Sequence, residues 1–242
     1  GKLPVILLGK PWEPAVTVKT AEHILNTTRD LFNARGEGSV TASDVALELG
    51  ISTGNLYYHF KGKEALHLAL FAKMQREMLV LMGTAIQPPG LFTGDRSTSP
   101  IETSWLFLTV ILEKMLEYRY LYESPRSVMA GFADIDRGFR RLLRMKQKVC
   151  GNIAAELIPL AGRDTDPQLS TVTNTMTLCM TCWLSYDPIL NPEDAEMLLV
   201  HRGVLQILSH CAPYLGSEQR NFYNVCEQLY RQMVDEETHP LD

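Results

Sequence analysis

The chain has 242 residues, 45% hydrophobic and 21% charged, which is typical of a globular protein with one large or two unequal domains. No apolar run approaches the roughly 20 residues of a membrane-spanning helix, and Val5–Leu8 is too short for a signal-peptide core. These features predict a cytoplasmic protein with no membrane partner. The net charge is −5, but residues 1–80 hold nine Lys and Arg against eight Asp and Glu. Because a DNA site needs only a local cluster of cations, the overall charge excludes little.

Five cysteines lie in otherwise apolar segments: Cys150, Cys179, Cys182, Cys211 and Cys226. Their odd number and scatter do not fit a disulfide framework. Cys179 and Cys182 would share one face of a helix and could form half of a metal site. No second Cys or His pair lies nearby at comparable spacing, so we expect core cysteines and no metal, with a redox switch as a further alternative.

Helical spacing dominates the chain and no long alternating strand pattern is present, so we expect an all-α fold. Residues 1–16, with prolines at positions 4, 11 and 14, predict an irregular N-terminal arm. A first helix is predicted from Thr17 to Arg35, with Ile24 and Phe32 on its apolar face and Gly36 as its left-handed stop.

The stretch from Thr41 to Phe60 predicts two short helices joined by a tight turn. Thr41 caps the first helix, Gly50 supplies the turn, and Ser52 caps the second. Leu56 anchors the second helix to the core. This pattern predicts a helix-turn-helix. The alternative is a three-helix bundle with a glycine turn and no role in DNA binding.

The second of these helices leaves small, polar and aromatic side chains facing outward: Thr53, Gly54, Asn55, Tyr57 and Tyr58. Such residues can enter a major groove and meet base edges, thymine methyl groups and phosphates. His59, Lys61 and Lys63 follow directly and could hold the phosphate backbone. The sequence therefore predicts double-stranded DNA as a partner.

The segment Thr53–Leu66, with its Leu-Tyr-Tyr-His-Phe core and its Lys-Gly-Lys continuation, resembles the TetR family of transcriptional regulators. The resemblance covers about residues 17–70. It implies that Thr53, Gly54, Asn55 and Tyr57 lie at base-reading positions. It places five further residues near phosphates: Thr41, Tyr58, His59, Lys61 and Lys63.

We therefore expect an N-terminal three-helix DNA-binding domain over residues 17–66, with a connecting helix at 62–85. A loop rich in Pro, Gly, Ser and Thr from Pro88 to Pro100 is predicted to mark the domain boundary. The larger C-terminal domain, residues 67–242, is predicted to be helical and to bind an effector and a second subunit. Its expected helices are 102–122, 124–132, 134–160, 166–185, 192–210 and 217–237. Asn191 is expected to cap the helix that opens at Pro192.

Large apolar side chains in this domain are candidates to line an effector cavity: Trp105, Met115, Tyr122, Phe132, Met176, Met180 and Trp183. Each of them also fits a plain helical core. The stretches Trp105–Leu108, Tyr118–Tyr122 and Trp183–Tyr186 resemble a PhaD-like subgroup of these regulators. That resemblance implies a small hydrophobic or amphipathic effector, of fatty-acid or acyl-CoA type.

The last two predicted helices carry wider apolar faces than one core needs, which predicts a homodimer joined as a four-helix bundle. The candidate interface residues are Leu198, Val204, Leu205, Ile207, Phe222, Leu229 and Met233. Two subunits would place two recognition helices about 34 Å apart on one face of a palindromic operator. The expected protein is a repressor released by its effector.

Three other functions stay open from the residues alone. An effector-independent regulator, repressor or activator, could use the same scaffold. A metal or redox sensor would rest on Cys179 and Cys182. An all-helical enzyme is the third, although no catalytic constellation and no Gly-rich phosphate loop stands out. We expect no enzyme activity and no cofactor.

Overall fold

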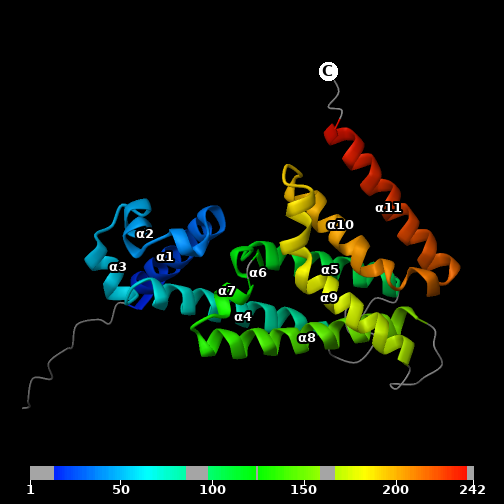
Figure 1. Cartoon of the computed structure of the whole chain (residues 1–242), viewed down its shortest axis with the longest axis horizontal. Coiled ribbons are helices and arrows are strands. Elements are labelled where there is room, and N and C mark those ends of the chain that lie inside the picture. The colour runs from blue at the N-terminus through cyan, green and yellow to red at the C-terminus, as the bar shows by residue number, and fades with distance from the viewer. Residues whose placement is uncertain (1–13, 86–97, 124, 159–166, 239–242) are drawn as a thin grey trace, which may run out of the picture. The chain divides into compact units, whose positions relative to one another are not determined.

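The computed structural model describes residues 14–85, 98–123, 125–158 and 167–238, and over these ranges it is helical with no strand (Figure 1). The predicted all-α class is confirmed. Most of the predicted N-terminal arm (1–16) and of the predicted loop (88–100) lies outside the described residues. In the described part, no helix is both long and apolar enough to span a membrane.

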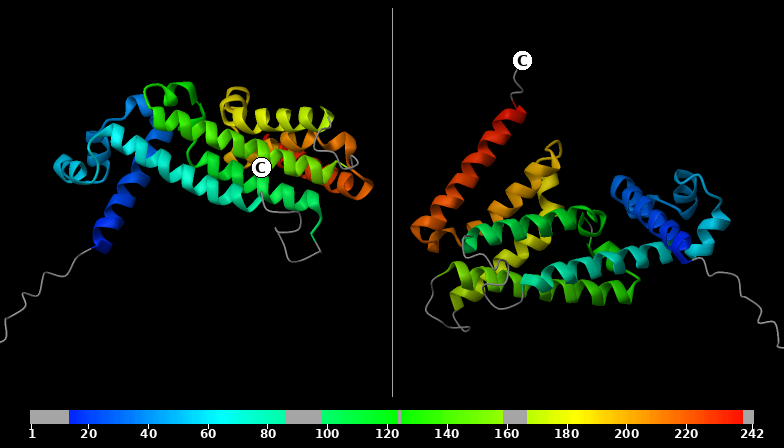
Figure 2. Two further views of the ribbon diagram at one scale, coloured as in Figure 1. Left: turned by 90° about the horizontal axis from the view of Figure 1, so that it is seen from below. Right: turned by 180° about the vertical axis from the view of Figure 1, so that it is seen from behind.

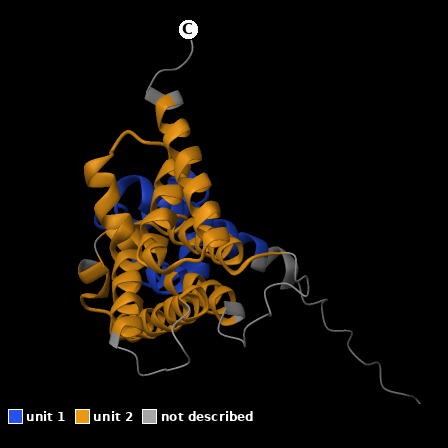
Figure 3. Ribbon diagram, turned by 90° about the vertical axis from the view of Figure 1, so that its right-hand side faces the viewer, with its two compact units in different colours: residues 1–70 blue, residues 71–242 orange. Residues whose placement is uncertain are grey.

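The chain divides into two compact units, unit 1 up to Leu70 and unit 2 from Phe71 onward (Figure 3). The division falls inside α4 (Lys63–Ala85), which supplies residues to both units. Unit 1 holds α1 (Pro14–Arg35), a 3₁₀ turn η1 (Glu37–Ser39), α2 (Ala42–Glu48), α3 (Thr53–His59) and the start of α4.

The core of unit 1 is a small apolar cluster contributed by all four of its α-helices. Its fully buried members include Ile24, Phe32, Val45, Leu56 and Leu66. The buried Thr28 hydroxyl donates to the Ile24 carbonyl oxygen at 2.7 Å, so its polar group is satisfied within α1. Gly36 ends α1 at a φ of 77°, in the left-handed region, as predicted.

The turn between α2 and α3 is fixed by local hydrogen bonds. Thr41 and Asp44 form a capping box at the start of α2, with Thr41 N donating to Asp44 Oδ2 at 2.7 Å and Asp44 N donating to Thr41 Oγ1 at 3.2 Å. Gly50 turns the chain at a φ of 64°, and Ser52 Oγ accepts from Asn55 N at 3.1 Å to cap α3. The predicted roles of these residues are confirmed.

Unit 2 is a larger bundle of helices. It contains α5 (Pro100–Leu116), α6 (Tyr120–Glu123), α7 (Pro125–Met129), α8 (Ala133–Leu157), α9 (Pro167–Leu190), α10 (Glu196–Ser209), a 3₁₀ turn η2 (Ala212–Tyr214) and α11 (Ser217–Thr238). Helix α8 packs against α9, and α10 packs against α5, α9 and α11. Figure 2 shows this packing from two further sides, with α11 reaching away from the bundle toward its C-terminal end.

The predicted helix boundaries are wrong in three places. The predicted helix 102–122 is broken, because α5 ends at Leu116 and α6 begins at Tyr120. Helix α9 continues through Pro188 to Leu190, and α10 begins at Glu196 with Ala195 as its N-cap. Asn191 does not cap α10, because its amide donates to Asp187 Oδ1 at 3.1 Å and is thereby held at the end of α9.

Candidate DNA-binding surface and effector domain

Helix α3 is anchored by one side chain and exposes most of the others. Leu56 is fully buried in unit 1. Thr53, Gly54 and Asn55 are exposed, and Tyr57 and Tyr58 have exposed fractions of 47% and 74%. The face that points away from the core therefore combines hydroxyl, amide and aromatic groups, a set that suits base edges and phosphates.

Tyr57 lies along the start of the next helix. A Cβ added at Gly62 would be 3.7 Å from Tyr57 Oη, and Gly62 has a φ of 94°, which favours glycine. The adjacent rings of Tyr58 and His59 meet edge to face with centroids 5.2 Å apart. Both arrangements keep the tyrosine rings close to the end of α3.

The two lysines after α3 differ in their surroundings. Lys61 is exposed. Lys63 Nζ forms an ion pair with Glu37 Oε1 at 3.0 Å and donates to the Gly38 carbonyl oxygen at 3.5 Å, which ties α4 to η1. The exposed Thr41 is similarly engaged, because its hydroxyl and its backbone N–H both bond to Asp44 Oδ2. Lys61 is thus the more available cation for a phosphate.

His67 was missed by the sequence-based reasoning. It is buried in unit 1, with Nδ1 3.7 Å from Glu37 Oε1 and its ring edge-on to Phe32 at 6.1 Å. Burial lowers the pKa of His67 below its ordinary value, against the opposing effect of Glu37. The sequence offered little indication of this position, because a single His in an apolar helical pattern does not reveal a partner 30 residues earlier in the chain.

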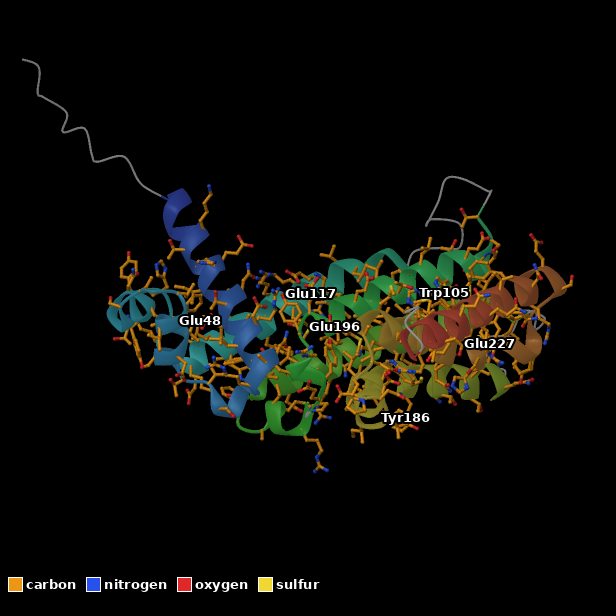
Figure 4. All side chains as sticks on the ribbon, turned by 90° about the horizontal axis from the view of Figure 1, so that it is seen from above. Glu48, Trp105, Glu117, Tyr186, Glu196 and Glu227 are labelled. Atoms are coloured by element: carbon orange, nitrogen blue, oxygen red, sulfur yellow. The ribbon has the colours of Figure 1, made fainter. Side chains whose placement is uncertain are left out.

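The seven predicted effector residues are spread through unit 2. Met115, Tyr122, Met176, Met180 and Trp183 are buried, whereas Trp105 and Phe132 are half-buried. Trp105 of α5 is labelled in Figure 4. Its ring centroid lies 6.2 Å from that of His201 and 6.1 Å from that of Phe222. Trp183 Nε1 donates to the Leu199 carbonyl oxygen at 2.9 Å. The seven residues lie on α5, α6 and α9 and at the N-cap of α8.

A groove of about 470 Å³ lies between α9 and α10. Of the predicted effector residues it includes Trp183, together with Leu178, Tyr186 and Leu190 from α9. Asp187 and Arg202 also line it, with Arg202 Nε and Nη2 donating to the two Asp187 oxygens at 2.7 and 2.8 Å. Arg202 Nη1 donates further to Asp194 and Tyr230, so this cation joins α9, α10 and α11.

The predicted dimer residues separate into two groups. Leu198, Val204, Leu205 and Ile207 are buried within the single chain. Phe222 and Met233 on α11 are half-buried, and Leu229 has an exposed fraction of 53%. Another apolar stripe that the sequence-based reasoning did not select is exposed along α9: Leu178, Tyr186, Ile189 and Leu190.

The five cysteines form no disulfide, with Cys182 exposed and Cys179 half-buried. Burial raises the pKa of Cys150 to about 11 and the pKa values of Cys179 and Cys211 to about 12, which makes these thiols poor nucleophiles at neutral pH. Among the described residues, no three His, Cys, Asp or Glu side chains gather as metal ligands would.

The capped turn and the exposed face of α3 define a helix-turn-helix protein, and two family models match this chain. The model for "Bacterial regulatory proteins, tetR family" matches residues 24–70, and the TetR model described as "Bacterial transcriptional repressor" matches residues 82–223. A regulator of Bacillus subtilis (strain 168), the uncharacterized HTH-type transcriptional regulator YerO, is 46% identical over 48 residues, which are 20% of this chain and 17% of YerO.

Solved structures share the fold. A TetR-family regulator from Marinobacter aquaeolei VT8 matches with a TM-score of 0.70 at 22% identity, over 87% of this chain and 98% of that one. A γ-butyrolactone receptor (ArpA-like protein) matches with a TM-score of 0.59 at 16% identity, over 90% and 99%. The ketosteroid regulator KstR2 of Mycobacterium tuberculosis matches with a TM-score of 0.55 at 17% identity, over 82% and 96%.

The chain belongs to the TetR family of bacterial transcriptional regulators. Members of this family are DNA-binding transcription factors, and the predicted family is confirmed. The PhaD-like subgroup is not confirmed by these matches.

Proposed function

We propose that this protein is a homodimeric repressor that binds a palindromic operator and is released by a small apolar or amphipathic effector bound in unit 2. It acts in the cytoplasm, where the chromosome lies. The observation that carries the proposal is the face of α3, which is held by the buried Leu56 and by the Ser52 cap and exposes Thr53, Asn55 and Tyr57.

In this proposal Thr53, Gly54, Asn55 and Tyr57 meet bases in the major groove. Lys61 is the principal phosphate contact, since its charge is exposed. Thr41, Tyr58, His59 and Lys63 lie further along the phosphate backbone, with Lys63 also holding η1 through Glu37. A helix of seven residues can read only a few base pairs, so a second copy of α3 is needed for a specific site.

The second copy comes from a homodimer joined through α9. The stripe Leu178, Tyr186, Ile189 and Leu190 is exposed in the single chain and lies opposite the buried face that includes Met176, Met180 and Leu184. A helix that is apolar on both faces is expected to be buried on both. Val225 and Leu229 on α11 are exposed apolar side chains as well.

Effector release requires that the ligand bind one conformation of the dimer more tightly than the other. Helix α4 supports such coupling, because one continuous helix belongs to both units. The structural neighbours include a γ-butyrolactone receptor and a ketosteroid regulator, which supports a small apolar effector here. They lend no support to a fatty-acid or acyl-CoA effector.

Operator selection from random DNA, followed by footprinting, tests the proposal. We expect protection of a palindrome. Asn55→Ala should weaken binding to it by about 1–3 kcal/mol with little change on non-specific DNA, as for loss of a bidentate base contact. Lys61→Met should weaken binding to the palindrome and to non-specific DNA alike. It should also reduce the slope of log K against log salt concentration by about 0.9 per subunit.

The control is Lys148→Met, which removes the same charge from an exposed position on α8. It should leave the affinity and the salt slope unchanged. A wild-type chain that selects no sequence, or an Asn55→Ala variant that binds the selected palindrome as wild type does, contradicts the proposed DNA contacts.

A further inference from the structure

Lys146 lies within α8 and has an exposed fraction of only 2%. Its ammonium group is 4.8 Å from the centroid of the Tyr122 ring. Over the described ranges, the structure contains no ion pair and no hydrogen bond that involves Lys146 Nζ. A buried lysine normally has a carboxylate partner, because a charge removed from water must be compensated. Contact with one aromatic ring recovers only part of the lost hydration.

The groups that face Lys146 come from three helices. Tyr122 on α6 lies beneath its ammonium, Cys150 is one turn further along α8, and Cys182 approaches from α9. None is a carboxylate. Burial raises the pKa of Cys150 to about 11 and also raises the pKa of Tyr122, so neither supplies an anion at neutral pH.

The side chains packed around Tyr122 are apolar and adaptable. The Tyr122 hydroxyl donates to the Met74 sulfur at 3.6 Å, and the Tyr122 ring meets Phe139 edge to face at 6.1 Å. Phe139 in turn packs against Phe71 at 5.2 Å. Methionine and aromatic side chains repack readily around an apolar body. The neighbourhood therefore offers one cation and a pliable apolar surface.

We propose that Lys146 is the anion-binding residue of the effector site, and that the effector is a small amphiphile whose single acidic group pairs with Lys146. Its apolar body lies against Tyr122, Met74 and Phe139. This inference rests on the proposed function, because it names the chemistry of the effector assumed there. It accounts for a buried cation that has no carboxylate partner among the residues that the structure describes.

A matched pair of fluorescent probes tests the assignment on the full chain. 1-Anilinonaphthalene-8-sulfonate carries a sulfonate, whereas N-phenyl-1-naphthylamine has the same ring system without it. We expect Lys146→Met to weaken binding of the sulfonate at least tenfold and to leave the neutral probe unchanged. Lys148→Met, an exposed lysine of the same helix, should change neither.

The pH dependence gives a second readout. Burial lowers the pKa of Lys146 to about 8, so its charged fraction falls about tenfold between pH 7 and pH 9. The sulfonate stays ionised over this range, and wild type should therefore lose about tenfold in affinity for it. Lys146→Arg, which does not titrate, should bind the sulfonate equally at both pH values.

Equal binding of the sulfonate by wild type and Lys146→Met overturns the assignment, as does a Lys146→Arg variant that has lost it. If Lys146→Met fails to fold, the sulfonate affinities of wild type and Lys146→Arg at pH 7 and pH 9 are sufficient to test the assignment. Wild-type operator binding is measured in the same buffer. Its absence contradicts the proposed function, whereas a negative probe result with intact operator binding contradicts only the Lys146 assignment.

Discussion

Lys63, Glu37 and His67 form a small cluster of ionisable side chains in unit 1. Glu37 Oε1 lies 3.0 Å from Lys63 Nζ and 3.7 Å from His67 Nδ1. One carboxylate is therefore within ion-pair distance of two residues of α4. Protonation of His67 would place a second positive charge beside Lys63 in a buried position. Because α4 begins at Lys63, these three side chains affect the stability of the helix-turn-helix unit.

We predict that His67 makes the protein less stable as the pH falls. Its pKa is lowered in the folded chain, mainly by burial, so the unfolded chain binds the proton more readily. The free energy of unfolding is therefore unaffected by His67 well above its unfolded pKa of about 6.5, and it declines as the pH falls below that value. Urea titrations at pH 7.5 and 5.5 measure the change.

The comparison needs a His67→Leu variant, because burial also lowers the pKa of His210. Wild type should lose more stability than His67→Leu between the two pH values. An equal loss in both proteins would show that His67 is not responsible.

For single residues, the sequence predicted contacts between residues close together in the chain. It did not predict contacts between residues far apart in the chain. The capping box of Thr41 and Asp44 and the Ser52 cap join residues three apart, and they were predictable from spacing alone. The ion pair of Lys63 with Glu37 joins residues 26 apart, and it depends on how η1 folds back. Lys63 was therefore assigned only to DNA, although the structure also gives it a partner within the chain.

Helix packing in unit 2 depends on one close approach at Gly203. A Cβ added there would lie 2.6 Å from Trp183 Nε1 and 2.8 Å from Leu112 Cδ1. The Trp183 indole cannot retreat freely, because Nε1 donates to the Leu199 carbonyl oxygen. The absence of a side chain at Gly203 thus allows α10 to pack against α5 and α9 together.

We predict that Gly203→Ala destabilises unit 2 by about 1–3 kcal/mol through overpacking. Gly83→Ala is the matched control, since a Cβ at this α4 position meets nothing within 4 Å. It should stabilise the protein by about 0.5–1 kcal/mol through helix propensity. Chemical denaturation at one fixed protein concentration measures both. Equal effects of the two substitutions would contradict the role assigned to Gly203.

Helix existence was easier to predict than helix ends. Apolar periodicity placed a helix near each of the long ones observed, but the start of α10 was missed. Asn191 followed by Pro192 resembles a cap in sequence, whereas the structure commits Asn191 to Asp187 at the end of α9. Asp187 is held by Arg202, which is 15 residues away, so the helix boundary is set by a tertiary ion pair.

At the scale of the whole molecule, the sequence also did not show which surface a second subunit would cover in the proposed dimer. The apolar residues of α10 were predicted to face a partner, but α5, α9 and α11 cover them within one chain. A periodicity argument shows how many faces of a helix are apolar and not which neighbour covers each. The exposed apolar stripe on α9 became visible only once the buried face of that helix was known.

We predict that Ile189→Asp converts the dimer into a monomer. Ile189 has an exposed fraction of 78% in the single chain, so the substitution should leave the protomer folded while placing a charge within the proposed contact. Sedimentation at micromolar concentration should change from twice 27.3 kDa to 27.3 kDa. Operator affinity should fall with it, because one recognition helix reads only half of a palindrome.

Val80→Asp is the matched control, an equally drastic change at an exposed valine of α4. It should leave both the sedimentation and the operator affinity as in wild type. A wild-type chain that sediments only at 27.3 kDa would contradict the dimer itself. An Ile189→Asp variant that stays dimeric would leave the dimer intact and place its contact elsewhere, with the exposed Leu229 on α11 as the next position to substitute.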